Sequence, residues 1–207
     1  GVPTLLHMSA LGAHKDSRSR YASTKARGEQ EVLKHFPKAT IFRPSVIFGP
    51  EDAFLNRFAQ MALLSPFLPL IGGGKTRFQP IYVGDVAECF VKALVLPEAK
   101  GKLYELGGPS VYTFKELMIY LLETIHRKRW LLPLPFSLAK VMASVAQFLP
   151  IPPLTPDQVE LLKSDTVVSP QALTAEDLDV SPKALEAVAP LYLERYRPRG
   201  GFWSQFP

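Results

Sequence analysis

The chain has 207 residues, of which 47% are hydrophobic and 21% are charged, a balance typical of folded globular proteins. No run of about 18 or more uncharged apolar residues occurs, so a membrane-spanning helix is not expected. The formal charge of +5 is dispersed, without a long basic stripe interleaved with aromatic residues, so nucleic-acid binding has little support.

Short apolar segments alternate with segments rich in helix-forming residues over the first 126 positions. Strands are expected at 3–9, 39–44, 78–83 and 102–107. Helices are expected at 18–35, 53–64, 86–96 and 114–126. Asp85 precedes the third helix and can cap it, and Thr113 with Glu116 forms a capping-box pattern before the fourth. This alternation predicts an α/β fold with one mainly parallel sheet.

The single cysteine, Cys89, lies among apolar residues of the third expected helix. It excludes an intrachain disulfide and a cysteine-based zinc site, and no metal site is predicted. A buried core thiol is favoured over a nucleophile. One unpaired cysteine also fits a reducing compartment.

The composition changes after about residue 130, where prolines become frequent. Between them, 136–149 is an almost wholly apolar segment with one charge, Lys140. It is too short to span a bilayer as a helix. Thr155 and Gln158 form a second capping-box pattern, with Pro156 at the first helical position. We therefore expect two parts: residues 1–104 in the sheet domain and residues 105–207 in a small, mainly helical subdomain.

Tyr21 and Lys25 carry the main chemical signal, because positions i and i+4 of a helix lie on one face. An ammonium group near the tyrosine hydroxyl favours tyrosinate and lowers the tyrosine pKa, so that the hydroxyl can exchange protons near neutral pH. Ser9, at the end of the preceding strand, can bind the same substrate oxygen. The pair alone is weak evidence, since a helix surface often carries one by chance.

The order of several further motifs adds weight to the pair. These motifs are Met8-Ser9-Ala10-Leu11-Gly12-Ala13, Gly28-Glu29, Arg43-Pro44-Ser45-Val46-Ile47-Phe48-Gly49-Pro50, Pro80-Ile81-Tyr82-Val83-Gly84-Asp85 and Tyr104-Glu105-Leu106-Gly107-Gly108-Pro109. Together they resemble the NAD-dependent epimerase/dehydratase branch of the short-chain dehydrogenase/reductase superfamily. The tail Leu154-Thr155-Pro156-Asp157-Gln158-Val159-Glu160 resembles the atypical group that contains an accessory subunit of respiratory complex I.

The resemblance implies the C-terminal part of a Rossmann-like sheet and a role for each matching residue. Tyr21 would be the acid/base, Lys25 its partner and a ribose ligand, and Ser9 a ligand of the substrate oxygen. The residues expected to pass near the nicotinamide are Pro44, Ser45 and Val46. Arg77 would meet a substrate or cofactor anion. Arg43 and Glu29 are interpreted as structural, with Glu29 at the surface or in a buried pair.

One part of the family pattern has no counterpart in this chain. The Gly-x-x-Gly-x-x-Gly turn, which holds the pyrophosphate at a helix N-terminus, is not found, and Gly72-Gly73-Gly74-Lys75 does not have phosphate-loop spacing. The resemblance implies NAD(P) as cofactor and favours NADP(H). Binding is expected to require an N-terminal half that this sequence lacks.

Three functional classes stay open. The protein is an oxidoreductase or epimerase acting on a sugar-like or isoprenoid-like alcohol, a largely non-catalytic NADP(H)-binding accessory subunit of a respiratory NADH dehydrogenase, or an interaction module without cofactor. The expected partners are a nicotinamide dinucleotide with a small-molecule substrate or with respiratory-complex subunits. The expected location is cytoplasmic, or peripheral at the inner or mitochondrial membrane. The apolar segment 136–149 either packs inside the subdomain or faces a partner or membrane.

Overall fold

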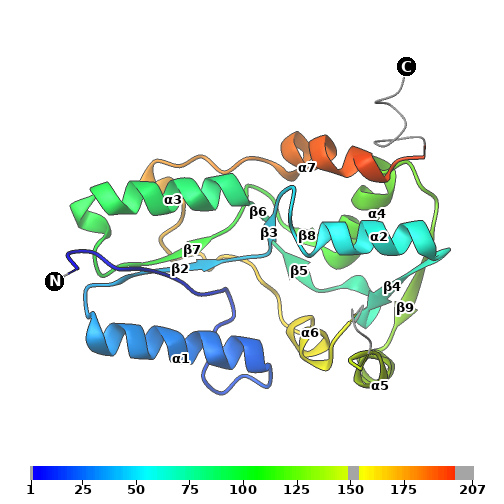
Figure 1. Ribbon diagram of the computed structural model, residues 1–207, viewed down its shortest axis with the longest axis horizontal. Helices are drawn as coiled ribbons and strands as arrows, with labels where there is room; N and C mark the ends of the chain where they lie inside the picture. The colour runs from blue at the N-terminus through cyan, green and yellow to red at the C-terminus, as the bar shows by residue number, and fades with distance from the viewer. Residues whose placement is uncertain (1, 149–153, 199–207) are drawn as a thin grey trace.

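The computed structural model describes residues 2–148 and 154–198. Its central layer is a parallel three-stranded sheet in the order β1 (Leu6–Met8), β2 (Thr40–Pro44) and β7 (Leu103–Leu106). Helix α1 (Arg20–His35) lies against one face of this sheet and α3 (Val83–Val95) against the other (Figure 1). The predicted α/β fold with part of a Rossmann-like sheet is confirmed.

Local sequence explains how α1 is set against the sheet. Ser19 caps the helix, because its hydroxyl accepts a hydrogen bond from the backbone N–H of Ala22 at 3.2 Å. Ala22, Ala26 and Glu29 are the buried residues of α1, and their spacing brings them onto one face. The small alanine side chains let the helix approach the sheet closely, which fixes the side on which Tyr21 and Lys25 project.

The expected strand at 78–83 does not belong to the main sheet, and that prediction is wrong. The segment divides at Pro80 into two short strands that pair elsewhere. The pairs are antiparallel β5 (Arg77–Phe78) with β8 (Tyr112–Thr113), and parallel β6 (Ile81–Tyr82) with β3 (Ile47–Phe48). Proline lacks the N–H that a ladder bond needs, which favours an interruption of the strand at position 80.

Asp85 is also placed differently from the prediction. Helix α3 begins at Val83, so Asp85 lies in its first turn and is not its N-cap. The carboxylate is fully buried and accepts hydrogen bonds from the backbone N–H and the Nζ of Lys183, at 2.7 and 2.9 Å. It therefore fastens α3 to the C-terminal part of the chain.

The other elements lie mainly to one side of the main sheet (Figure 1). The α-helices there are α2 (Leu55–Leu64), α4 (Phe114–Thr124), α5 (Phe136–Ala146), α6 (Pro156–Leu161) and α7 (Leu185–Leu193). A parallel ladder joins β4 (Phe67–Ile71) to β9 (Trp130–Leu134). Among the described helices, none is long and apolar enough to cross a membrane.

Two hydrophobic cores hold these elements together. One joins β2, β6, β7 and α3 and includes Phe42, Ile81 and the buried Cys89, as predicted for that thiol. The other unites α2, β4, α4, α5 and α7 around Phe58, Leu70 and Leu121. The division of the chain between residues 104 and 105 stays a prediction.

Candidate functional site

Tyr21 sits in the first turn of α1, and a carboxylate from a distant helix holds that turn. Asp157 of α6 accepts hydrogen bonds from the Ser19 hydroxyl at 3.2 Å and from the backbone N–H groups of Arg20 and Tyr21 at 2.6 and 3.1 Å. These are N–H groups that an α-helix cannot satisfy internally at its start. The motif expected to begin a helix at 155 thus also positions the helix that carries Tyr21.

Lys25 lies one turn after Tyr21, on the same side of α1. Its Nζ is 5.7 Å from the centroid of the Tyr21 ring and donates a hydrogen bond to the carbonyl oxygen of Met8 at 3.1 Å. Burial raises the pKa of Tyr21 above its usual value. The expected lowering of this pKa by Lys25 is therefore not found, since burial is the cause of the shift.

Ser9 and Ala10 follow β1 and have different surroundings. Ser9 is buried, and its Oγ has no hydrogen-bond partner among the described residues. Ser9 is not part of the cavity wall beside Tyr21, whereas Ala10 is. The cavity wall therefore contains the Ala10 methyl group, and the Ser9 hydroxyl, which was predicted to bind a substrate oxygen, lies outside the wall.

Behind Lys25, Glu29 and Arg43 form a two-bond ion pair. The Arg43 Nε and Nη2 atoms donate to the two carboxylate oxygens of Glu29 at 2.8 and 2.6 Å. Burial alone would raise the pKa of Glu29, but the hydrogen bonds from Arg43 lower it below its usual value. Glu29 is thus half of a buried pair, as interpreted from the sequence, and its lowered pKa does not suit a general base.

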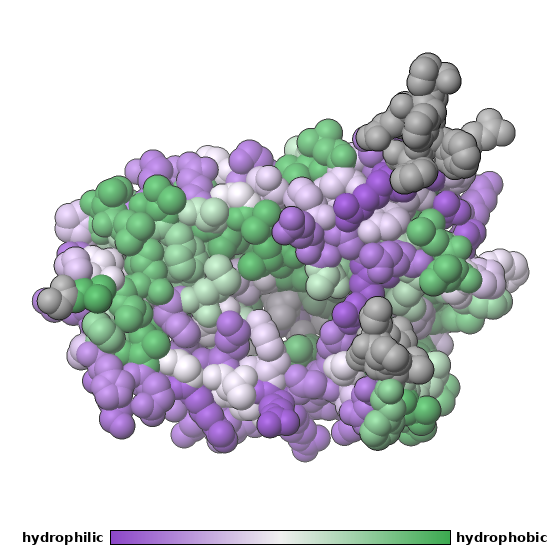
Figure 2. All heavy atoms as spheres, in the orientation of Figure 1, coloured by the Kyte–Doolittle hydropathy of each residue, from purple (hydrophilic) through white to green (hydrophobic). Residues whose placement is uncertain are grey.

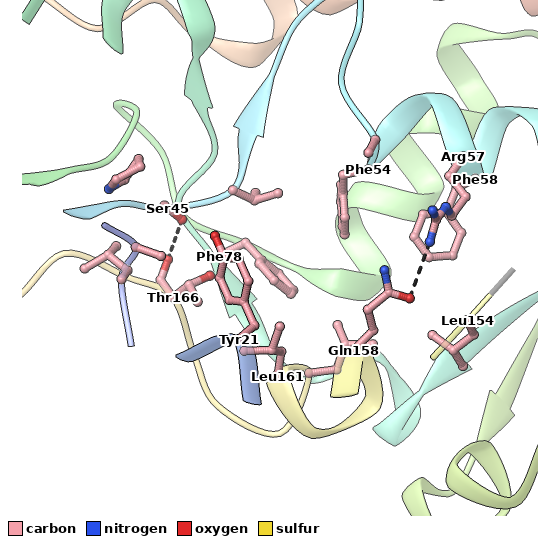
Figure 3. A pocket seen from close by; sticks show the side chains of 16 residues that line it. Tyr21, Ser45, Phe54, Arg57, Phe58, Phe78, Leu154, Gln158, Leu161 and Thr166 are labelled. Atoms are coloured by element: carbon pink, nitrogen blue, oxygen red, sulfur yellow. Dashed lines mark hydrogen bonds between the residues drawn. The ribbon is translucent and has the colours of Figure 1, made fainter. Parts of the chain in front are cut away.

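A cavity of about 250 Å³ opens beside Tyr21 (Figure 3). Pro44, Ser45 and Val46, which were expected near the nicotinamide, line it together with Tyr21. Most of the remaining wall is apolar. It consists of Ala10, Leu11, Ala53, Phe54, Phe58, Phe78, Leu154, Leu161 and Leu162, with the polar residues Arg57, Gln158 and Thr166. The cavity thus joins residues from the sheet end to residues of α2 and α6.

Three polar residues of the wall were not foreseen. Arg57 donates from Nη1 to Gln158 Oε1 at 3.3 Å, and Thr166 lies next to Ser45 (Figure 3). Gln158 belonged to the predicted capping box, but nothing in the sequence indicated that α6 turns it toward α2. The predicted anion ligand Arg77 is not part of this wall, and Asp165 binds its Nε at 2.8 Å.

The described residues fit one end of a nicotinamide dinucleotide. Tyr21 shares a cavity wall with Pro44, Ser45 and Val46, and Lys25 lies beside the Tyr21 ring, which is the arrangement expected for ribose and nicotinamide ligands. A pyrophosphate needs free N–H groups at a helix N-terminus. The first turns of the first four α-helices instead carry or bind carboxylates. These belong to Asp157 at α1, Asp52 at α2, Asp85 at α3 and Glu116 at α4.

Comparison with known proteins gives one family match and similar full-length proteins. Residues 7–107 match the NAD dependent epimerase/dehydratase family. The mitochondrial NADH dehydrogenase (ubiquinone) 1 alpha subcomplex subunit 9 of Arabidopsis thaliana is 41% identical over 97% of this chain and 52% of its own length. Its namesake from Mus musculus is 38% identical over 95% of this chain and 52% of its own length. The chain thus spans about half the length of these relatives.

Solved structures agree on the fold. The NADPH-dependent quinone oxidoreductase QOR2 of Escherichia coli, solved with NADPH, superposes with a TM-score of 0.72 at 19% identity. The similarity covers 93% of this chain and 66% of that structure. At this identity the likeness concerns the path of the backbone alone.

Proposed function

Because residues 7–107 match the NAD dependent epimerase/dehydratase family, we propose that the chain is the nicotinamide-side part of a protein of that family that binds NADP(H). We propose further that the complete protein is a largely non-catalytic accessory subunit of a respiratory NADH dehydrogenase. The placement of Tyr21 carries the proposal, since it shares one cavity wall with Pro44, Ser45 and Val46 and has Lys25 beside its ring.

In this proposal the main role of Tyr21 and Lys25 is to bind the dinucleotide. The Lys25 ammonium donates to ribose hydroxyls, and the Tyr21 hydroxyl orients the nicotinamide end. A bound dinucleotide supplies a hydride where a substrate is present. We propose that the pyrophosphate is held by a part of the complete protein that this chain does not include; carboxylates at the starts of the first four described α-helices disfavour another anion at those four starts.

Two observations favour binding over turnover. The pKa of Tyr21 is raised by burial, so its hydroxyl is a weaker acid than an ordinary tyrosine at neutral pH. Both full-length relatives named above are called NADH dehydrogenase subunits and mitochondrial. We therefore propose a mitochondrial location and respiratory-complex subunits as partners.

An oxidoreductase or epimerase is the second candidate function. It is favoured by the cavity itself, because Tyr21 faces a space large enough for a small molecule. A tyrosine that only bound ribose would need no such space on its other side. Bound dinucleotide would then have to lower the pKa of Tyr21 by bringing Lys25 closer to its hydroxyl.

One experiment on the complete protein tests the binding proposal. NADPH is titrated and its fluorescence followed in the wild type, Lys25→Ala and Lys34→Ala, an exposed lysine on the same helix. We expect Lys25→Ala to weaken binding at least tenfold and Lys34→Ala to leave it unchanged. Equal affinity in all three proteins would refute the role of Lys25.

A second experiment separates an accessory subunit from an oxidoreductase. Oxidation of NADPH is followed with candidate ketones in the wild type and in Tyr21→Phe. An enzyme should lose turnover by about a hundredfold or more, the usual scale for losing a general acid. An accessory subunit should show little turnover in either protein while keeping its NADPH affinity. Robust wild-type turnover would reject the accessory role.

A further inference from the structure

A second concave site lies beside α5, outside the cavity that contains Tyr21. It is a groove of about 380 Å³ between α5, α6 and the turn that precedes α1. Helices α5 and α6 lie side by side there (Figure 1). The charged residues of the groove are Arg18, Lys140, Asp157, Glu160 and Lys163. Among the described residues that line it, none is aromatic and none is a large aliphatic residue, so the groove suits a charged ligand.

The two carboxylates of the groove are already occupied. Asp157 accepts three hydrogen bonds from the start of α1. Glu160 accepts a hydrogen bond from the Nζ of Lys163 at 2.8 Å. Both negative charges are therefore committed to bonds within the protein.

The cations of the groove exceed what its carboxylates compensate. Arg18 and Lys140 are exposed, and neither forms an ion pair with a carboxylate of residues 2–148 or 154–198. Their charges still act on the groove. The pKa of Glu160 is below its usual value, first because Lys163 donates a hydrogen bond to it and also because all three cations favour its ionised form. An anion placed in the groove therefore meets a positive potential.

Helix α5 joins this groove to an apolar face. Ala139 and Ala143 are buried, whereas Val141 and Val145, one turn apart, are exposed. Lys140 precedes Val141, and successive helical residues are about 100° apart around the axis, so the apolar face begins next to the groove. A ligand in the groove can therefore extend an apolar part along α5.

A phospholipid combines these two properties. Its phosphate is an anion, and acyl chains are joined to it. Inorganic phosphate or an acidic peptide segment would match the cations but leave the exposed face of α5 unused. A helix of 11 residues is too short to cross a bilayer, but it can lie in the bilayer surface with cations at the level of the headgroups.

We propose that the groove binds the phosphate of an anionic phospholipid in a bilayer surface, with Arg18 and Lys140 as its ligands. The outer face of α5 lies against the acyl chains of the same leaflet. This inference goes beyond the proposed NADP(H) binding and does not require it, because the groove and the cavity with Tyr21 share no lining residue among those described.

The test measures binding of the complete protein to vesicles by co-sedimentation. One set of vesicles is pure phosphatidylcholine, and the other contains phosphatidylcholine with phosphatidylglycerol. We expect the wild type to bind the anionic vesicles about tenfold or more tightly than the neutral ones. Each cation near an anionic surface contributes about fivefold, so Arg18→Gln with Lys140→Gln should weaken that binding about tenfold or more.

A matched pair of substitutions removes the same charge elsewhere. Lys100→Gln with Lys102→Gln changes two exposed lysines beside the start of β7 and should weaken binding less than about threefold. All four side chains are exposed, so both double variants should melt at the wild-type temperature. NaCl should weaken binding more in the wild type than in the variant without Arg18 and Lys140, because salt screens exposed charges.

Several outcomes would overturn the inference. They include equal binding of the wild type to both kinds of vesicle and equal losses in the two double variants. Displacement by inorganic phosphate beyond that by NaCl of equal ionic strength would assign the groove to free phosphate instead. Retention in respiratory membranes without binding to either kind of vesicle would indicate a protein partner and would also reject the lipid site.

An NADPH titration of the same samples tests the proposed function separately. Both double variants should bind NADPH like the wild type, because their substitutions lie outside the cavity with Tyr21. A wild type that binds anionic vesicles but not NADPH would contradict the proposed function and leave the lipid site standing. A wild type that binds NADPH but not anionic vesicles would reject the lipid site alone.

Discussion

Helices α4 and α5 are both strongly apolar, yet the protein uses them in opposite ways. Helix α4 buries its large side chains, among them Phe114, Met118 and Leu121. Helix α5 fully buries only Ala139 and Ala143 and leaves most of its larger residues in solvent. Those residues are Leu138, Val141, Met142 and Val145, between 51% and 71% exposed. The position of the small residues, and not the total hydrophobicity, decides which face of α5 meets the core.

The surroundings of α5 suggest what covers its outer face. Apolar residues gather at the corner of the molecule where α5 lies (Figures 1 and 2). Arg18, Lys140 and Lys163 line a groove beside the helix together with Asp157 and Glu160. An apolar stripe flanked by cations suits a membrane surface or a large partner. Leu149, part of the same predicted segment, lies outside the described residues.

The largest difference should appear in stability. Leu121→Ala in α4 removes a fully buried side chain and should lower the free energy of unfolding by about 2–5 kcal/mol. Val145→Ala in α5 removes an exposed side chain and should change it by less than about 0.5 kcal/mol. Urea denaturation of both variants measures the two values. Equal losses would show that α5 is packed against something in the complete protein.

The second prediction tests the outer face of α5 directly. We propose that the outer face of α5 docks on a membrane, so that Val141→Glu with Val145→Glu should reduce the membrane-bound fraction of the complete protein about tenfold or more. The protein should stay folded, because both side chains are exposed. Leu64→Glu with Leu191→Glu changes two exposed residues on other helices and serves as the control. Release by both pairs would point to a general charge effect and not to docking through α5.

Local sequence predicted local structure well. Both capping boxes, Thr113 with Glu116 and Thr155 with Gln158, are confirmed. Each depends on residues three positions apart, so its geometry follows from the helix itself. The main-sheet strands 40–44 and 103–106 also lie within a residue or two of their predicted ends.

Features that depend on distant parts of the chain were not predicted. The ladder between β4 and β9 joins segments about 60 residues apart, and periodicity within either segment gives no sign of the partner. The same reason explains why Asp157, Arg57 and Thr166 were missed as parts of the site. Their roles arise only when α6 and the segment after it pack beside Tyr21 and α2.

The third prediction concerns the starts of α4 and α5. Thr113 accepts from the backbone N–H of Glu116 at 3.2 Å, whereas α5 begins after Pro135 without a side-chain cap. Thr113→Ala should therefore cost about 1 kcal/mol of stability. Pro135→Asp should add a cap to α5 and cost nothing or stabilise it slightly. Urea midpoints compare the two variants. A neutral Thr113→Ala would mean that packing alone holds the first turn of α4.

The smallest expected effect is a pH dependence confined to α4. The Glu116 carboxylate accepts from the Thr113 backbone N–H at 2.7 Å, and this bond lowers the pKa of Glu116 below its usual 4.5. A lowered pKa means that the carboxylate stabilises the fold above pH 4.5, and that this contribution disappears as the pH falls through the folded-state value. Glu116→Gln keeps a hydrogen-bond acceptor but does not titrate. The wild type should therefore lose slightly more stability than Glu116→Gln between pH 7 and pH 3, measured by urea denaturation.

Helix α5 has no acidic residue in its first turn, so Ser137→Ala should leave the pH dependence unchanged. Parallel pH profiles for the wild type and Glu116→Gln would contradict the prediction and assign the acid sensitivity to other carboxylates, Glu29 first among them.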